Sequence, residues 1–156
     1  MEEDRPLVAQ AAALSPDCLA ALRAGYRAEA LLALGERFLT APCPAAAPWA
    51  SFVMGGLYPS TAISPLQREL ILTALLAARQ QPGTMAVHMY WAMMEGADPQ
   101  AIAHVVLLTG TYTGIDCYTI GIRTLSRLGP LLQQLVDEGQ TDTVSVMQAI
   151  VQLFPA

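Results

Sequence analysis

The sequence contains few charged residues: 13% of its 156 residues are Asp, Glu, Lys or Arg, while 54% are hydrophobic. A chain of this length fits one domain, residues 1–156, whose surface needs much polar cover. The shortage of charge therefore indicates that part of the apolar surface meets another subunit. We expect a homo-oligomer.

Basic residues, cysteines and long apolar runs are also scarce. The eight Lys and Arg residues are scattered and the net charge is −5, which argues against nucleic acid as a partner. Three widely separated cysteines, Cys18, Cys43 and Cys117, fit reduced thiols better than disulfides or a zinc site. No apolar run approaches the ~20 residues of a membrane span, and the acidic amino terminus lacks the features of a secretory signal. We expect a cytoplasmic chain with no membrane partner.

Helical signals dominate the sequence, and no stretch of useful length alternates with the period of a strand. The pattern predicts an all-α, single-domain bundle of about six helices. A proline-rich connector and a short apolar segment separate the first two. The expected helices are 15–38, 64–79, 84–95, 99–127, 131–138 and 142–153.

Local signals mark where these helices begin and end. Ser15, Ser64 and Asp98 each precede a proline and are expected to be N-caps, and Thr84 is expected to cap the helix over 84–95. Gly129-Pro130 is expected to end the helix over 99–127. The glycines inside that helix either kink it or admit a close neighbour. They are Gly110, Gly114 and Gly121.

Residues 64–116 carry several features in a fixed order. An Arg-Glu pair ending at Glu69 stands early in an Ala/Leu-rich helix, His88 precedes a helix-ending glycine by eight residues, and a Tyr-x-Gly motif begins at Tyr112. In order and spacing this segment resembles the carboxymuconolactone decarboxylase and alkylhydroperoxidase D superfamily. The resemblance implies a helical bundle of the alkylhydroperoxidase D type that assembles as a homotrimer or homohexamer.

The resemblance puts Glu69 and His88 at the glutamate and histidine of a proton relay in the peroxidase branch. That branch has a Cys-x-x-Cys motif before the histidine. Here Gln81 and Thr84 stand at the two cysteine positions, and Gly83 replaces the histidine between them. Thiol peroxidase chemistry needs an attacking thiolate and a resolving thiol. We expect no such activity.

The decarboxylase branch also lacks the cysteines, and the sequence is closer to it. Its chemistry needs a proton donor and acceptor and a site for an anionic dienolate. The sequence departs from the family at His104, where an acidic residue is usual, and at Asp116, where proline is common. We therefore expect a diverged enzyme with cofactor-free acid/base chemistry: decarboxylation, isomerisation or lactone opening of a small cyclic acid or ketone. The alternative is a non-catalytic binding or assembly module on the same scaffold.

The enzyme hypothesis assigns roles to four candidate residues. His88 is expected to move the proton, Glu69 to orient it, and His104 and Tyr112 to hydrogen-bond a developing oxyanion. Structural readings compete with these roles. His88 can be a core histidine satisfied by a carbonyl, and His104 can simply cover the helix surface. Glu69 can be an ordinary partner in the neighbourhood of Arg68 or lie on a solvated helix face.

Helix geometry alone does not join Glu69 to His88. In a flat antiparallel hairpin they lie about 16 Å and about 6 Å from the Pro-Gly break between their helices. Their proximity is implied only by the family architecture, in which the helices cross. The same arithmetic puts His88 and His104 at similar height. With Glu69 they would form a two-His-one-carboxylate metal site, but no further ligand stands at helical spacing, and we expect neither metal nor cofactor.

Aromatic and methionine side chains gather around these helices. Tyr90 and Trp91 belong to this set, which fits the core, a subunit interface or the wall of a pocket for a flat or unsaturated ligand. Asp116 follows the Tyr-x-Gly motif. We take Tyr90, Trp91 and Asp116, together with Tyr112, as candidates for substrate contact.

Overall fold

The computed structural model describes residues 14–155, which form helices and, within that range, no strand. The fold is therefore all-α, as predicted, but with eight α-helices in the described range rather than about six. The elements are α2 (Pro16–Gly25), α3 (Ala28–Thr40), the 3-10 turn η1 (Pro44–Ala46), α4 (Ala47–Phe52), the π-helical turn η2 (Val53–Leu57), α5 (Pro65–Ala78), α6 (Pro82–Met94), α7 (Pro99–Thr113), α8 (Ile115–Asp137) and α9 (Thr143–Leu153).

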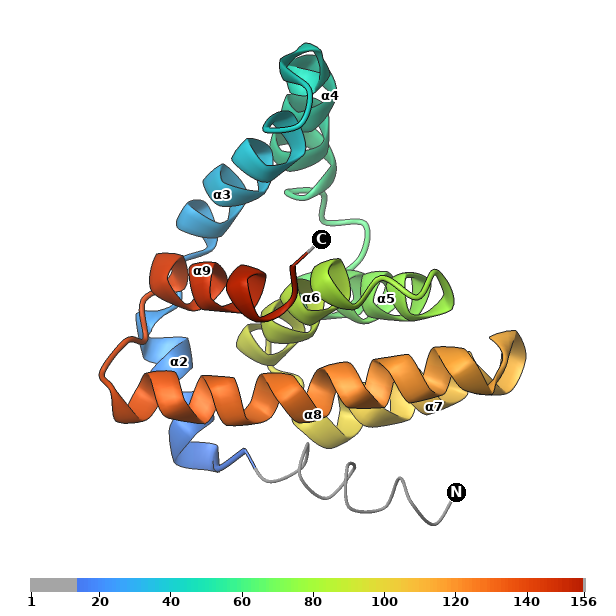
Figure 1. Cartoon of the computed structure of the whole chain (residues 1–156). Coiled ribbons are helices and arrows are strands. Elements are labelled where there is room, and N and C mark those ends of the chain that lie inside the picture. The colour runs from blue at the N-terminus through green and yellow to red at the C-terminus, as the bar shows by residue number, and fades with distance from the viewer. Residues whose placement is uncertain (1–13, 156) are drawn as a thin grey trace.

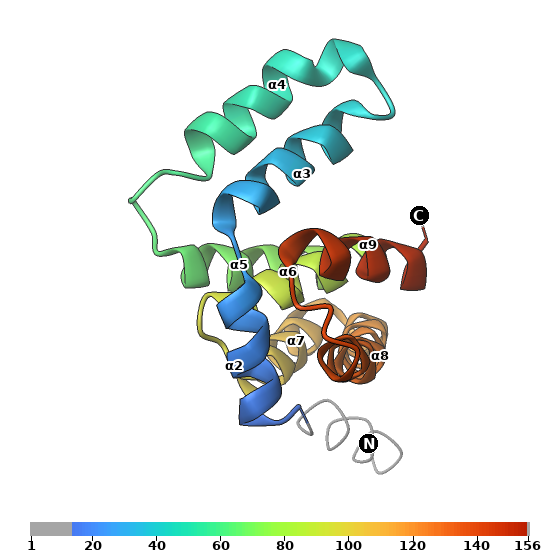
Figure 2. The ribbon, with the colours of Figure 1, turned by 90° about the vertical axis from the view of Figure 1, so that its left-hand side faces the viewer.

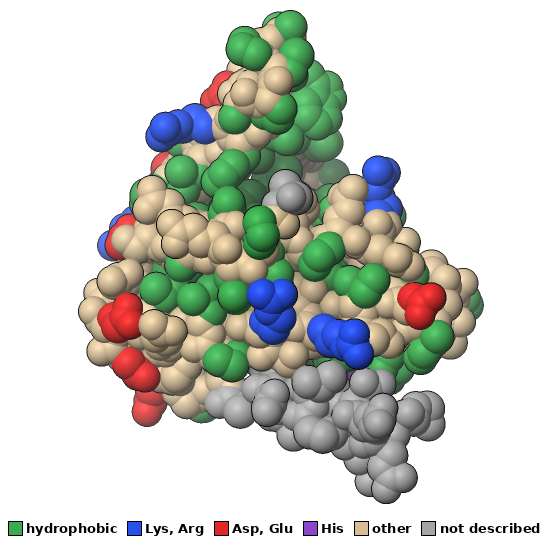
Figure 3. All heavy atoms as spheres, in the orientation of Figure 1, with side chains coloured by type: hydrophobic (Ala, Val, Ile, Leu, Met, Phe, Trp, Pro, Cys, Tyr) green, Lys and Arg blue, Asp and Glu red, His purple; other side chains and the backbone are tan. Residues whose placement is uncertain are grey.

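The helices form a body and a projecting arm (Figure 1 and Figure 2). The body consists of α2 and α5 to α9, with α7 and α8 side by side along one edge. The arm, residues 28–57, consists of α3, η1, α4 and η2 and is anchored where α3 packs on α9. Figure 3 shows hydrophobic side chains gathered over the α4 end of the arm. The large exposed ones of the arm are Phe38, Trp49, Phe52 and Leu57.

The centre of the body is α6, which packs against α2, α5, α7, α8 and α9. Every residue from Met85 to Met94 is buried except Val87, which is half-buried. A helix that is apolar on all sides lies in a core. His88 therefore stands inside the most enclosed element of the fold.

The single helix predicted over 15–38 is wrong, because the chain breaks at Tyr26 and Arg27, whose backbones are extended. The N–H of Arg27 donates to the side chain of Thr143 over 2.8 Å instead of continuing the helix. A Cβ atom at Gly25 would lie 2.2 Å from the carbonyl oxygen of Thr141. The break is therefore a tertiary contact with the start of α9, which local sequence does not encode.

The expected helix over 99–127 is divided differently. Gly114 ends α7 with φ +114°, a conformation that glycine adopts without steric cost, and α8 begins at the next residue. The prediction that Gly129-Pro130 ends a helix is wrong, since Pro130 lies inside α8. Leu125, Leu128, Leu132 and Leu135 are buried on both sides of it, so core packing carries the helix through.

The start of α6 also differs from the prediction. The helix begins at Pro82 with Gln81 as N-cap, and Gln81 makes no side-chain cap bond, so Thr84 lies within the first turn. The predicted caps at Ser15, Ser64 and Asp98 are confirmed.

Within the described range, no helix is both long and apolar enough to span a bilayer.

The predicted close neighbour of the glycines lies within the chain. A Cβ atom at Gly110 would lie 2.5 Å from the Cβ atom of Tyr118, and one at Gly121 would lie 2.3 Å from Val106. Both glycines therefore set the close approach of α7 to α8. Gly110 therefore serves packing within the subunit.

Gly110→Ala should lower the free energy of unfolding by about 1–3 kcal/mol, because the added methyl group meets the Cβ atom and backbone of Tyr118, which cannot rotate away. Chemical denaturation monitored by circular dichroism measures the change. Gly55→Ala is the matched control, since a Cβ atom there has no neighbour within 4 Å. Equal stability of the two variants would contradict the packing argument.

Candidate active site

Two adjacent residues in the first turns of α5, Arg68 and Glu69, begin the site. The helix starts with a capping box in which Ser64 accepts from the Gln67 N–H and the Gln67 side chain accepts from the Ser64 N–H. Glu69 then falls on the inward face of α5 together with Thr73. The cap thus fixes where the helix begins and which face carries the carboxylate.

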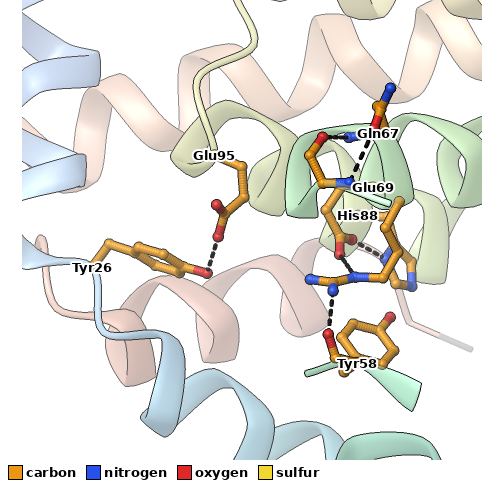
Figure 4. Close-up of polar contacts among 8 residues, drawn as sticks. Tyr26, Tyr58, Gln67, Glu69, His88 and Glu95 are labelled. Carbon is orange, nitrogen blue, oxygen red and sulfur yellow. Dashed lines mark hydrogen bonds and ion pairs between the residues drawn. The ribbon is translucent and has the colours of Figure 1, made fainter. Parts of the chain in front are cut away.

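The carboxylate of Glu69 meets the imidazole of His88 inside the protein (Figure 4). Glu69 Oε2 lies 2.8 Å from His88 Nδ1, and the two side chains are 1% and 10% exposed, respectively. The axes of α5 and α6 are inclined to each other, which removes the offset of a flat hairpin (Figure 1). The proximity implied by the family resemblance is therefore present, and the structural reading of Glu69 as a solvated residue is wrong.

Arg68 holds the other oxygen of the same carboxylate. Its Nε atom donates to Glu69 Oε1 over 2.9 Å, and an Nη1 hydrogen donates to the carbonyl oxygen of Tyr58. The guanidinium carbon lies 4.4 Å from the centre of the Tyr58 ring, within cation–π distance. Both carboxylate oxygens of Glu69 thus have a partner, as a buried charge requires.

Aromatic contacts close the cluster into a ring of five side chains. The Tyr58 ring meets Trp91 edge to face with centroids 5.8 Å apart, and Trp91 meets the His88 ring at 4.9 Å. Trp91 is oriented by its Nε1 hydrogen, which donates to Met147 Sδ over 3.3 Å. Burial raises the pKa of Tyr58, the charge of Glu69 raises it further and Arg68 opposes them. Tyr58 therefore stays a neutral phenol. The ring consists of Arg68, Glu69, His88, Trp91 and Tyr58.

Sequence reasoning did not assign a role to Arg68 or Tyr58. The Arg-Glu pair was visible, and the charge of Arg68 next to an inward-facing glutamate was the available signal. The sequence held no signal for Tyr58, because it is the π turn η2 that brings this residue to the site. The Tyr58 N–H bonds to the Val53 carbonyl oxygen in the i to i+5 pattern of a π turn.

Two of the four predicted substrate-contact residues lie in α6, but only one of them belongs to the ring. Trp91 contacts His88 directly. Tyr90 is 0% exposed and packs in the core. Burial raises the pKa of Tyr90, and the charge of Asp142 adds to the shift. Tyr90 is therefore enclosed by the core in this structure, and its role in substrate contact stays a prediction.

The remaining predicted site residues lie on the surface. His104 is exposed on α7, where its Nδ1 hydrogen donates to the carbonyl oxygen of Gln100 over 2.9 Å. Tyr112 is 84% exposed, and Asp116 is exposed at the start of α8. None of the contacts that the described residues make joins them to His88. Because α7 packs chiefly on α5 and α8, α6 and α7 do not form the hairpin that would pair His88 with His104.

Metal-ligating side chains do not cluster in residues 14–155. No three His, Cys, Asp or Glu side chains are grouped there so that they could hold one ion. The two-His-one-carboxylate arrangement considered from the sequence is therefore not assembled, since His104 lies apart on α7.

The segment that contains this ring matches the sequence model of a known protein family. Residues 44–116 match the model of the carboxymuconolactone decarboxylase family, a segment that begins upstream of Ser64 and includes Tyr58 as well as Arg68, Glu69 and His88. This match supports the assignment of the segment to the carboxymuconolactone decarboxylase and alkylhydroperoxidase D superfamily. No curated protein and no solved structure matches the chain.

The neutral imidazole of His88 should carry its proton on Nδ1, because the carboxylate of Glu69 can only accept. Nitrogen-15 NMR at a pH where imidazoles are neutral distinguishes the two tautomers. In Glu69→Gln the preference for Nδ1–H should fall, while the signals of His104, bonded to Gln100, should stay unchanged. A His88 ring protonated on Nε2 in the unmodified protein would contradict the assignment.

Proposed function

We propose that the chain is an enzyme that transfers protons without a cofactor, in the decarboxylation, isomerisation or lactone opening of a small cyclic acid or ketone. The observation that carries the proposal is the buried contact of 2.8 Å between Glu69 Oε2 and His88 Nδ1. A histidine oriented by a carboxylate is the usual means of moving a proton near neutral pH.

In this mechanism the bond from Nδ1 to Glu69 leaves the lone pair of His88 on Nε2. Nε2 accepts a proton from the carbon next to the substrate carbonyl, and the charge of Glu69 stabilises the imidazolium that forms. The same imidazolium then returns the proton to another atom of the enolate. Trp91 and Glu69 together hold the ring orientation during both transfers.

The oxyanion role first considered for His104 and Tyr112 has no support within one subunit, since both side chains are exposed on α7. Arg68 is the better candidate. It already contacts Glu69, and it carries a permanent positive charge that would stabilise an enolate.

Thiol peroxidase activity is not part of the proposal. Gln81 and Thr84 occupy the positions at which the peroxidase branch has cysteines. Cys18 and Cys117 are buried, and Cys43 is exposed. Burial raises the pKa of Cys18, and the charge of Asp137 adds to the shift, so Cys18 is a poor thiolate.

The second candidate function is a binding or assembly module without catalysis. One observation favours it: the His88 side chain is only 10% exposed, so a substrate has limited access in this conformation. The module retains the ring of five side chains as a structural unit and transfers no proton.

We further propose that the chain forms a homotrimer or homohexamer through α5 and α7, which pack side by side. Large apolar side chains are exposed on both helices and at the adjoining start of α8, and association would remove them from water. They are Ile71, Leu75, Leu107, Leu108, Tyr112 and Ile115.

His88→Gln should lower kcat/KM by at least about 100-fold, the lower end of what a positioned acid/base group contributes. The assay is deuterium exchange next to the carbonyl in a panel of cyclic ketones, keto acids and unsaturated lactones, followed by proton NMR. His104→Gln is the matched control and should keep full activity. Unchanged exchange in a folded His88→Gln protein, or no exchange with any substrate, would favour the binding module.

Light scattering coupled to gel filtration at micromolar concentration should give three or six times the subunit mass of 16.6 kDa. Leu108→Glu should shift the mass towards the monomer, because it places a charge in the proposed interface. Val151→Glu, on the exposed face of α9, is the control and should leave the mass unchanged. A mass near 16.6 kDa for the unmodified protein would refute the assembly.

A further inference from the structure

A cavity of about 340 Å³ lies between the base of the arm and the start of α5. Its volume is in the range of small-molecule sites. Apolar side chains form much of the wall, including Leu31, Leu32 and Ile63, while Arg68, Tyr58 and Glu95 supply polar groups. Neither Glu69 nor His88 lines it. Arg68 and Tyr58 therefore belong to both the cavity and the ring of five side chains.

Arg68 is the only cation among the residues that line the cavity. Its Nε and Nη1 atoms are used by Glu69 and by the Tyr58 carbonyl oxygen. Its Nη2 atom has no acceptor among the described residues, and the side chain is 17% exposed. A partly buried guanidinium with a free edge is suited to a carboxylate, which it binds through parallel charge-assisted hydrogen bonds.

The charges of Arg68, Glu69 and His88 also favour a carboxylate ligand. Glu69 is the single carboxylate in the ring and contacts both Arg68 and His88, so with His88 protonated these three side chains carry one net positive charge. An anion bound at Arg68 would balance it. Glu95 also lines the cavity, bonded to the Tyr26 hydroxyl and set apart from Glu69 in Figure 4, and it would repel a second carboxylate.

We propose that the cavity binds a small monocarboxylic acid with an apolar body, whose carboxylate pairs with Nη2 of Arg68. The apolar body lies against Leu31, Leu32 and Ile63. As a substrate subsite this inference rests on the proposed function. It names the class of substrate, and it makes Arg68 the residue that selects it.

Benzoate is the probe, and benzamide, of the same shape but without charge, is its matched control. Benzoate should bind saturably and shift the Arg68 Nε–H resonance in NMR, and benzamide should bind at least about tenfold more weakly. Equal binding of the two ligands would overturn the carboxylate assignment.

Two variants separate the cavity from general charge effects. Arg68→Gln removes the guanidinium, and Ala28→Phe fills the cavity from its α3 wall while leaving the Arg68 contact to Glu69 in place; each should reduce benzoate affinity at least about tenfold. Arg37→Gln removes an exposed charge from the same helix as Ala28 and should leave the affinity unchanged. Retained binding in Ala28→Phe, or equal loss in Arg37→Gln, would refute the site.

The benzoate-binding experiment tests the cavity whether or not the chain catalyses a reaction. His88→Gln should still bind benzoate saturably, because it retains Arg68 and the cavity wall, although it loses the pairing of the anion with a protonated imidazole. Benzoate binding without His88-dependent exchange would uphold the subsite and refute the proposed catalysis. His88-dependent exchange without benzoate binding would refute the subsite and uphold the catalysis.

Discussion

The carboxylate of Glu69 is a charge in the interior of the protein, and the arrangement around it follows from the need to balance that charge. It is 1% exposed, and an unpaired carboxylate at such a position would be strongly destabilising. One oxygen is satisfied by Arg68 from the same helix and the other by His88 from α6. Because α6 is otherwise an apolar core helix, Glu69 also provides the partner that allows His88 to be buried there.

The two partners of Glu69 differ in what they can do. Arg68 keeps its positive charge, so one oxygen of the Glu69 carboxylate has a permanent cationic donor beside it. In the proposed mechanism the imidazole of His88 accepts and returns a proton beside a carboxylate that Arg68 already compensates. Such a cluster suits a reaction in which negative charge develops on the substrate as the histidine becomes protonated.

The parts of the fold that were predictable from the sequence are those that depend on neighbours in the chain. The caps at Ser15, Ser64 and Asp98 use residues within a single turn, and the helical periodicity needs only a few more. The break at Arg27 and the continuation of α8 through Pro130 depend on packing against distant segments. Local rules therefore predicted one helix where the chain forms α2 and α3, and they predicted a helix end at Pro130, where α8 is continuous.

The site divides in the same way. Spacing along two helices placed Glu69 and His88 at different heights, and only the family resemblance implied that they meet, because the crossing of α5 and α6 is set by side chains along both helices. The place of Tyr58 in the site could not be predicted for a related reason. A π turn is a rare local conformation, and nothing in the run Val53–Leu57 distinguishes it from a short helix or a loop.

Tyr58 connects the arm to the body at the point where the charge balance is made. Its carbonyl oxygen accepts from Arg68, its ring lies against the guanidinium, and the same ring meets Trp91 in an edge-to-face contact. Arg68 can hold Glu69 and Tyr58 together only while Tyr58, at the end of η2, keeps its present position beside Arg68. The conformation of the arm and the geometry of the carboxylate are therefore coupled through one arginine, and a displacement of either would change the hydrogen bonds available to the other.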